Sequence, residues 1–374
     1  MAERFETVIV GGGQAGLATG FHLARRGCAF VILDAGERVG DSWRSRWDSL
    51  RLYSPARFDS LPGLEFPAPR HSFPSGQEMG GYLERYAAVH DLPVRTGARA
   101  DALGRAGGGY LVTAGEQRFE AANVVVATGA FAAPSVPAFA ADLDPRIVQL
   151  HSRDYRGPHQ LGDGPVLVAG AAHSGADIAH ELATAGHETI LSGRDTGQLP
   201  VPVESRRARL LLPLLRLAWT RVVTVDTPVG RKVGPKIRKH GGPLLRIRRR
   251  ELAAAGVERV HERTAGVAGG LPMLEGGRVL EVANVVWCTG FRPDYSWIDL
   301  PLDLDEDGYP RQYRGAVASE PGLYFVGLPF LHSFASMLVL GAGRDGERVA
   351  AHIADRMGGA DDEVRAPLHE ALSR

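Results

Sequence analysis

The sequence predicts an α/β fold built from two copies of one strand-loop-helix unit. A glycine-rich loop at Gly11–Gly16 follows an apolar strand and returns at Gly170–Gly175. An apolar strand that ends in Thr-Gly, Ala122–Gly129, returns at nearly the same offset as Ala283–Gly290. Two independent features that recur at one spacing indicate two Rossmann-like dinucleotide-binding domains, and the alternating strand and helix patterns favour parallel sheets.

The first copy has the features that bind a dinucleotide. The strand Val8–Val10 leads into GxGxxG and then a helix pattern over Leu17–Arg26. The first glycine of such a loop permits a tight turn, the second lets the backbone approach a pyrophosphate, and the third allows close helix–strand packing. The next strand, Ala29–Leu33, ends before Asp34, where a carboxylate can accept hydrogen bonds from an adenosine ribose. We therefore expect this copy to bind FAD.

The second copy lacks that carboxylate. The strand Glu188–Leu191 is followed by Ser192, Gly193 and Arg194, and Gly193 stands at the spacing that holds Asp34 in the first copy. No acid at this position would repel a 2′-phosphate. Arginine binds phosphate with charge-assisted, often bidentate hydrogen bonds. This copy is therefore expected to bind NADPH in preference to NADH.

One residue of the second loop departs from the pattern. Ala172 occupies the position of the middle glycine, where the backbone lies closest to the pyrophosphate. A methyl group there should push the coenzyme back slightly. We still expect the loop to bind a nicotinamide dinucleotide.

The two copies divide the chain into three segments. Residues 1–157 are expected to form the first part of the FAD domain, and residues 158–275 the NADPH domain, with an insertion near 199–250. Residues 276–374 should complete the FAD domain, because Thr289–Pro293 and a final helix from Gly341 need a surface to pack on. The expected architecture is a glutathione-reductase-like flavoprotein in which the NADPH domain is inserted into the FAD domain.

The segment after Asp34 resembles the class B flavin-dependent monooxygenases, the family of enzymes similar to flavin-containing monooxygenase. That family carries Gly-Gly-x-Trp here, and this chain has Gly40-Asp41-Ser42-Trp43, so Asp41 replaces the second glycine. The resemblance continues through Tyr53–Pro55, both Thr-Gly strands and Gly322–Gly327, and covers most of the chain outside the insertion. It implies a monooxygenase that uses FAD, NADPH and molecular oxygen. A C4a-hydroperoxyflavin would then oxygenate a small, lipophilic molecule at N or S.

The family's linker signature, FxGxxxHxxx followed by Phe or Tyr, is half present. His151 and Tyr155 match it, whereas Pro145 and Ile147 stand where Phe and Gly are expected. The related Baeyer–Villiger enzymes have Trp at the position of Tyr155, so the tyrosine favours heteroatom oxygenation over ketone insertion. A structural role for His151, in which hydrogen bonds hold the linker, explains the residue equally well.

The resemblance also implies an asparagine beside the flavin in many members. Aligned on the segment after Trp43, this chain has Tyr53 and Ser54 instead, whose hydroxyls could substitute for the amide. No side chain is assigned a general acid or base role, because the flavin itself activates oxygen in this chemistry. The residues expected to hold the cofactors are Gly11, Gly13, Gln14, Ala15, Gly16, Asp34, Gly40, Ser42, Trp43, Tyr53, Ser54, Thr128, Gly129, Gly170, Ala172, His173, Ser174, Gly175, Ser192, Arg194, Thr289 and Gly290.

Composition narrows the alternatives. The formal net charge is +0, so the whole chain gives no electrostatic reason to expect nucleic acid as a partner. Cys28 and Cys288 are the only cysteines and form no CxxC, so a disulfide reductase would lack its cysteine pair, and no metal-ligand spacing surrounds them. No secretory signal is recognised, and the expected compartment is the cytoplasm. An NADPH oxidase or electron-transfer reductase, a Baeyer–Villiger-type monooxygenase and a non-enzymatic binding protein remain as alternatives.

The insertion is strongly basic. Between Arg206 and Arg250 it holds eleven Arg and three Lys against the single acid Asp226, together with a leucine-rich stretch. Arg209 and Arg216 are seven residues apart and would share one helical face. Three interpretations stay open: a cover over the flavin pocket, an ordinary surface subdomain, and a peripheral membrane-surface helix that admits lipophilic substrates.

Overall fold

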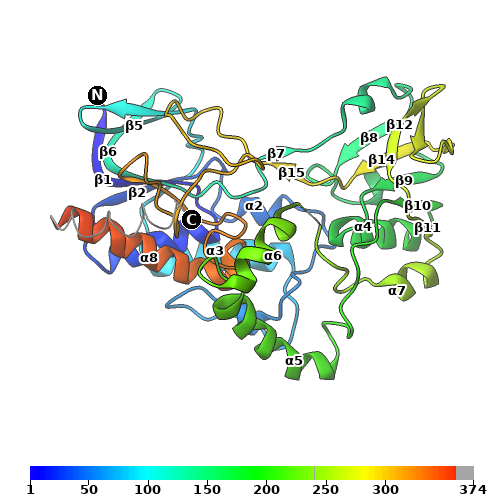
Figure 1. Ribbon diagram of the computed structural model, residues 1–374, viewed down its shortest axis with the longest axis horizontal. Helices are drawn as coiled ribbons and strands as arrows, with labels where there is room; N and C mark the ends of the chain where they lie inside the picture. The colour runs from blue at the N-terminus through cyan, green and yellow to red at the C-terminus, as the bar shows by residue number, and fades with distance from the viewer. Residues whose placement is uncertain (240, 359–374) are drawn as a thin grey trace.

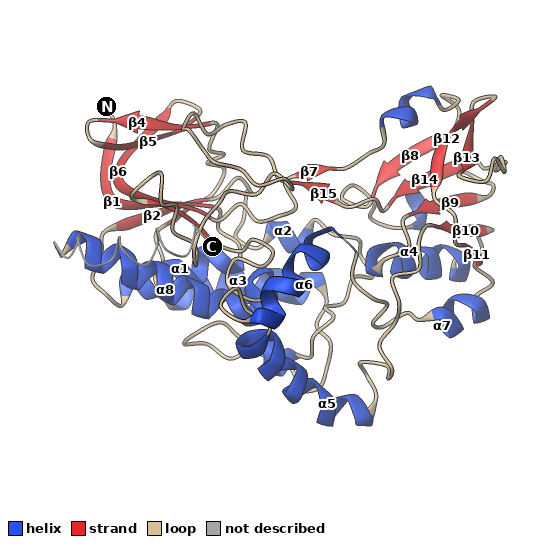
Figure 2. Ribbon diagram, viewed as in Figure 1, coloured by secondary structure: helices blue, strands red, loops and turns tan. Residues whose placement is uncertain are grey.

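The structure is a computed structural model that describes residues 1–239 and 241–358. Residue 240, inside the expected insertion, and residues 359–374, at the end of the expected third segment, lie outside the described residues. Two β-sheets lie at opposite ends of the long axis of the molecule (Figure 1). The labelled α-helices gather on one side of the sheets, and two short strands join the two ends (Figure 2).

The first sheet has the strand order β3-β2-β1-β6-β5-β4, with β16 paired to β6. The strands β1, β2, β3, β6 and β16 pair in parallel. The chain therefore comes back to its first sheet after the second one is complete. The strands are β1 (Glu3–Val10), β2 (Phe30–Leu33), β3 (Val94–Arg95), β4 (Ala102–Ala106), β5 (Gly109–Ala114), β6 (Gln117–Val126) and β16 (Leu323–Phe325).

The expectation of parallel pairing is wrong for one arm of this sheet. β4 and β5 pair antiparallel with each other, and β5 pairs antiparallel with β6. The connections explain the direction, because antiparallel strands can be joined by a tight hairpin whereas parallel strands need a long crossover. Gly107 and Gly108 join β4 to β5 and both have positive φ, +54° and +85°, as a two-residue hairpin loop requires.

The second sheet is parallel throughout, in the order β11-β10-β9-β14-β8. Two of its strands, β8 and β14, lie outside the expected 158–275 segment. The boundaries at 157 and 275 are therefore too narrow for this sheet, because the repeated Thr-Gly strand pairs with the strand that precedes the second glycine loop. The strands are β8 (Val148–His151), β9 (Val166–Ala169), β10 (Thr189–Ser192), β11 (Glu258–Val260) and β14 (Asn284–Trp287).

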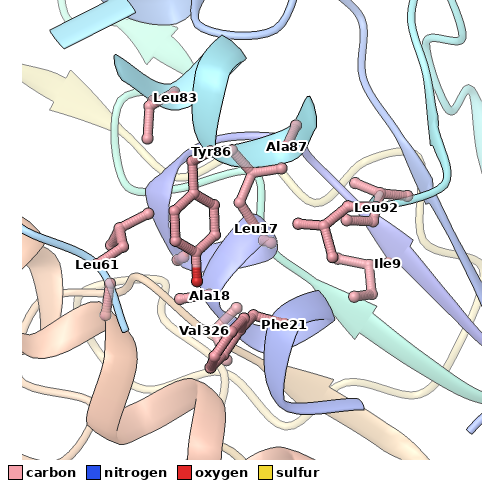
Figure 3. Close-up of a cluster of buried hydrophobic side chains, with 14 of the residues drawn as sticks. Ile9, Leu17, Ala18, Phe21, Leu61, Leu83, Tyr86, Ala87, Leu92 and Val326 are labelled. Carbon is pink, nitrogen blue, oxygen red and sulfur yellow. The ribbon is translucent and has the colours of Figure 1, made fainter. Parts of the chain in front are cut away.

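A hydrophobic core lies between the first sheet and its helices (Figure 3). Ile9 of β1, Leu17 and Phe21 of the first helix, Tyr86 of the third helix and Val326 after β16 are all buried there. This core fixes the glycine loop between β1 and the first helix. The helices outside the insertion are α1 (Gln14–Ala24), α2 (Asp41–Arg44), α3 (Gly76–Val89), α4 (His173–Thr184) and α8 (Val339–Met357).

The insertion is helical and lies below the junction of the two ends in Figure 1. None of the helices within the described ranges has the length and apolar character needed to cross a membrane. The remaining elements are α5 (Arg206–Leu217), α6 (Pro228–Lys239), α7 (Arg249–Ala254), the hairpin β12 (Thr264–Ala268) and β13 (Leu271–Leu274), and the two joining strands β7 (Ala133–Pro134) and β15 (Phe291–Arg292).

Candidate functional site

The first glycine loop has the shape of a dinucleotide cradle. A Cβ at Gly11 would lie 2.5 Å from the Ala127 carbonyl oxygen, and one at Gly16 would lie 1.9 Å from the Gly11 carbonyl oxygen. A Cβ at Gly13 would meet no atom within 4 Å. The loop therefore closes tightly at its outer glycines and is open at the middle one. The residues present fit a pyrophosphate at the N-terminus of α1.

Asp34 lies beside this loop, at the end of β2. The Gly12 N–H donates to its Oδ2 at 2.6 Å, and the Gly36 N–H donates to its Oδ1 at 2.7 Å. The carboxylate is thus held in place by the backbone on both sides. Each carboxylate oxygen can accept more than one hydrogen bond, so a ribose hydroxyl can still be bound here.

The turn that replaces the family's Gly-Gly pair needs only one glycine. Gly40 has φ +92°, and a Cβ there would lie 2.3 Å from the Gly80 carbonyl oxygen. Asp41 folds its side chain back onto the same turn. Its carboxylate accepts from the Arg38 N–H at 2.9 Å and from the Arg44 guanidinium at 3.1 Å. The turn therefore accommodates Asp41 in place of the second glycine, with its side chain hydrogen-bonded to the turn itself.

Trp43 connects this turn to the first glycine loop. Its Nε1–H donates to the Gln14 Oε1 at 3.1 Å, at the first residue of α1. Ser42 and Thr128 are exposed, and Ala15 is buried at the base of the helix. Of the residues expected at the first site, Trp43 and Gln14 thus meet directly at the N-terminus of α1.

The second loop repeats the backbone of the first. Gly170 has φ +112° where Gly11 has +114°. A Cβ at Gly170 would lie 2.3 Å from the Cys288 carbonyl oxygen, and one at Gly175 would lie 1.8 Å from the Gly170 carbonyl oxygen. The two copies predicted from the sequence therefore have the same local geometry. Cys288 serves close packing here, since its Cβ lies 3.4 Å from the Cβ position of both glycines.

The middle position of the second loop is covered. Ala172 caps α4 with φ −84° and ψ −168°, close to the −77° and −175° of Gly13. A Cβ at Gly241 would lie 2.6 Å from the Ala172 Cβ, and one at Gly242 would lie 2.3 Å from the His173 Cε1. The end of the insertion therefore passes directly over the second loop.

Gly193 takes the place in the second sheet that Asp34 has in the first. In each copy the first glycine of the loop donates its N–H to the last strand residue, at 2.7 Å to the Leu33 oxygen and at 2.8 Å to the Ser192 oxygen. The register inferred from the sequence is thus present in the fold. Arg194 follows as an exposed side chain that has no ion pair with any residue in the described ranges.

Ser192 and Arg194, the two residues expected to flank the 2′-phosphate, differ in their exposure to solvent. Ser192 is buried and its hydroxyl lies 2.8 Å from the Thr264 hydroxyl, so it does not face the same space as Arg194. Sequence reasoning missed Arg259, whose guanidinium donates to the Gly193 oxygen at 2.6 Å and to the Leu191 oxygen at 3.1 Å. Burial lowers the pKa of Arg259. No motif spacing in the sequence predicts a role for Arg259, because this residue lies on another strand, β11.

The two ends of the molecule meet at Asp177 of α4. Tyr53, from the first part of the chain, donates its hydroxyl to the Asp177 Oδ2 at 3.0 Å, and the Arg246 Nη2 lies 3.4 Å from the same oxygen. The Tyr53 ring also lies against the His173 ring, with 4.9 Å between centroids. Burial raises the pKa of Asp177 to about 6 and lowers that of His173 to about 4. Sequence reasoning missed Asp177, although an acid on the inner face of a helix is a visible signal.

The neighbouring Ser54 is bound to a second buried acid. Its hydroxyl donates to the Asp59 Oδ1 at 2.5 Å. Asp59 is fully buried, its Oδ2 has no hydrogen-bond partner within the described part of the chain, and burial raises its pKa to about 7. The hydroxyl protons of both Tyr53 and Ser54 are therefore already donated to carboxyl groups.

The linker residues have structural partners. The His151 Nε2–H donates to the Gly290 oxygen at 3.0 Å, and its Nδ1 accepts from the Arg153 N–H at 3.1 Å. The Tyr155 hydroxyl donates to the Glu181 Oε2 of α4 at 2.9 Å. The Thr289 hydroxyl and the Gly290 oxygen are likewise bound by Ser135. The second Thr-Gly pair thus holds the connection between the two ends.

The insertion packs on the first part of the chain and on the C-terminal segment. Ala208 and Leu212 of α5 contact Phe58, and the Arg216 guanidinium lies over the Phe58 ring. Trp219 packs on Phe334, with ring centroids 5.0 Å apart. The insertion therefore packs over the loop that follows Tyr53 and Ser54.

Comparisons with known proteins agree with this architecture. Residues 8–206 match the pyridine nucleotide-disulphide oxidoreductase family. An uncharacterized CzcO-like oxidoreductase of Geobacillus kaustophilus is 34% identical over 91% of this chain and 96% of its own length. Probable indole-3-pyruvate monooxygenase YUCCA7 of Arabidopsis thaliana is 28% identical over 93% and 87%.

A solved structure extends the likeness to the whole fold. The flavin-containing monooxygenase of Stenotrophomonas maltophilia is 25% identical and superposes with a TM-score of 0.76, covering 96% of this chain and all of that one. The two proteins thus share an α/β fold over nearly the whole length of this chain. The chain belongs to the pyridine nucleotide-disulphide oxidoreductase family, as an enzyme of the flavin-containing monooxygenase type that uses FAD and NADPH.

Proposed function

We propose that the protein oxygenates a small, lipophilic molecule at N or S, with FAD at the first glycine loop and NADPH at the second. The observation that carries the proposal is the pair of loops with matching backbone geometry, joined through Tyr53, His173 and Asp177. Such a junction would hold a hydride donor and its acceptor close to each other.

The first site would hold FAD through the open space at Gly13 and the carboxylate of Asp34. The pyrophosphate would lie against Gly13 at the N-terminus of α1, and Asp34 would accept from the adenosine ribose. Trp43, fixed by Gln14, would bound the flavin side of this site. The FAD domain in this proposal is 1–157 with 276–374, apart from the strands β8 and β14.

The second site would hold NADPH along α4, within the 158–275 segment extended by those two strands. Arg194 would bind the 2′-phosphate, because Gly193 leaves the position of Asp34 without a carboxylate. The backbone of Ala172 would face the pyrophosphate. His173 and Ser174, at the start of α4, would lie between this site and Tyr53.

Bound FAD would accept the hydride from NADPH and supply the oxygen chemistry. The chain contributes orientation and exclusion of water. The insertion, packed over Phe58, would close the pocket from solvent and give it an apolar lining. Neither Cys28 nor Cys288 has a second cysteine beside it in the sequence. The chain therefore lacks the neighbouring cysteine pair that a dithiol mechanism of disulphide reduction would use.

One observation favours a second candidate, an NADPH oxidase. The resemblance implies an amide donor beside the flavin, and the two hydroxyls that replace it donate to Asp177 and Asp59 instead. Neither proton is then available to a bound cofactor. Baeyer–Villiger chemistry and a cytoplasmic location stay predictions from the sequence.

A balance of products tests the proposal. The purified flavin-loaded protein is mixed with NADPH and oxygen in the presence of an aryl methyl sulfide, a tertiary amine or a cyclic ketone. Oxygenation predicts sulfoxide or N-oxide in proportion to the NADPH consumed, with little hydrogen peroxide. Peroxide equal to the NADPH consumed with every probe would support the oxidase, and lactone from the ketone alone would support the Baeyer–Villiger reaction.

A further inference from the structure

The outer face of α5 is apolar and exposed in the described part of the chain. Leu210, Leu214 and Leu217 are 80%, 66% and 51% exposed, and their spacing of four and three residues places them on one stripe of the helix. The opposite stripe is buried, since Ala208 and Leu212 pack on Phe58. Helix α5 thus has two apolar faces, of which only one packs on other residues that the structure describes.

Positive charges border the exposed leucines. Arg206 and Arg207 precede Leu210 by four and three residues and share its face, and Arg221 stands four residues after Leu217. All three are exposed, and none has an ion pair with a residue that the structure describes. The one acid between Arg206 and Arg250, Asp226, is bound to Arg314 at 2.8 Å and does not neutralise them.

We propose that α5 docks the protein on an anionic lipid surface, with Leu210, Leu214 and Leu217 among the acyl chains and the arginines at the phosphate headgroups. A helix with leucines on one stripe and unpaired arginines beside them fits the boundary of a bilayer, where apolar interior and negative charge lie in one plane. The contact is peripheral.

Charge complementarity selects this partner. Exposed leucines alone would suit a second copy of the chain equally well. In a symmetric contact through α5, however, the same unpaired arginines would face each other with no acid on the helix to oppose them. On an anionic bilayer this repulsion is absent, and burial of the leucines still contributes a favourable free energy.

Vesicle binding by the full-length flavin-loaded protein tests the proposal. Sedimentation is measured with vesicles of phosphatidylcholine alone and with vesicles that also contain phosphatidylglycerol, at low and high salt. We expect binding to the anionic vesicles only, and weaker binding at high salt, because exposed charges are screened.

Two double variants and a control separate the contributions. Leu210→Ser with Leu214→Ser should weaken vesicle binding at least about tenfold. Arg206→Gln with Arg207→Gln should weaken it about fivefold for each arginine removed. Val89→Ser, which changes a 55% exposed apolar residue at the end of α3, should leave it unchanged. NADPH oxidation without vesicles should be the same in all of them, because none of these residues contacts a cofactor site.

Three results would overturn the proposal. The first is no binding to anionic vesicles at low salt. The second is binding that the leucine and arginine variants leave unchanged. The third is a dimer in solution that the leucine variants dissociate while vesicle binding is absent, which would assign the stripe to a second copy of the chain.

Discussion

The Tyr53 hydroxyl donates a hydrogen bond of 3.0 Å to the Asp177 carboxylate, across 124 positions of sequence. Tyr53 follows the first glycine loop and Asp177 lies one turn into the helix that follows the second. Arg246, at the end of the insertion, reaches the same carboxylate. Three segments of the chain are thus fixed to each other at one buried acid.

Removing this hydroxyl should loosen the junction. Tyr53→Phe leaves the buried Asp177 oxygen with Arg246 alone, so we expect the free energy of unfolding to fall by about 1–3 kcal/mol. The ring contact with His173 stays. Flavin reduction by NADPH, followed anaerobically by stopped flow, should become slower because the two loops are held less firmly.

Tyr110→Phe is the matched control. It removes a hydroxyl that donates to the Pro321 oxygen at 3.0 Å, within the first unit and away from the junction. A similar loss of stability with an unchanged rate of flavin reduction is expected. If the Tyr53 and Tyr110 variants reduce flavin at the same rate, the junction does not position the cofactors.

The pH dependence of stability should report the buried carboxyl of Asp177. Burial raises its pKa from 3.8 to about 6, so between these values the native state binds more protons than the unfolded state. The wild type should therefore lose stability relative to Asp177→Asn as the pH rises from about 4 to 6, by up to about 3 kcal/mol.

Asp195→Asn gives the opposite sign and serves as the control. The hydrogen bond from the Gly197 N–H, with Arg249 nearby, lowers the pKa of Asp195. The wild type should hence lose stability relative to this variant as the pH falls below about 4. Unfolding curves recorded across the pH range measure both slopes. A flat difference for Asp177→Asn would show that this carboxyl is not perturbed.

Coenzyme preference should depend on Arg194. Arg194→Ala should cost NADPH binding about 1.5–3 kcal/mol and leave NADH binding nearly unchanged, since only NADPH carries the 2′-phosphate. Dissociation constants of both coenzymes for the oxidised protein measure the effect. Arg263→Ala, an exposed arginine of the same unit, is the control. Equal losses for both coenzymes would remove Arg194 from the phosphate site.

The middle position of the second loop gives a paired test. Ala172→Gly should tighten NADPH binding several-fold if its methyl group crowds the pyrophosphate. Gly241→Ala should lower the free energy of unfolding by about 1–3 kcal/mol, because the new Cβ would lie 2.6 Å from the Ala172 Cβ. Combining the two substitutions should restore stability. Weaker NADPH binding in Ala172→Gly would contradict the crowding argument.

The sequence by itself determined the two glycine loops, the strands that enter them and the exchange of Asp34 for Gly193. These features depend on short spacings, and a parallel strand-loop-helix unit converts such spacings directly into positions. The same logic predicted Arg194 just after β10, where it is exposed and has no ion pair among the described residues. It also anticipated the second Thr-Gly strand, although not the boundaries of its sheet.

Only the tertiary structure decided which side chains meet between these units. Ser192, expected beside a phosphate, is buried against Thr264, 72 positions away. Asp177 gains its partners from residues 124 and 69 positions distant, and Asp59 captures the hydroxyl of Ser54. The physical reason is that burial and hydrogen bonding of a side chain depend on what packs over it. In these examples the partners come from the first segment, from the insertion and from the hairpin that follows it, and no local spacing encodes where these segments lie.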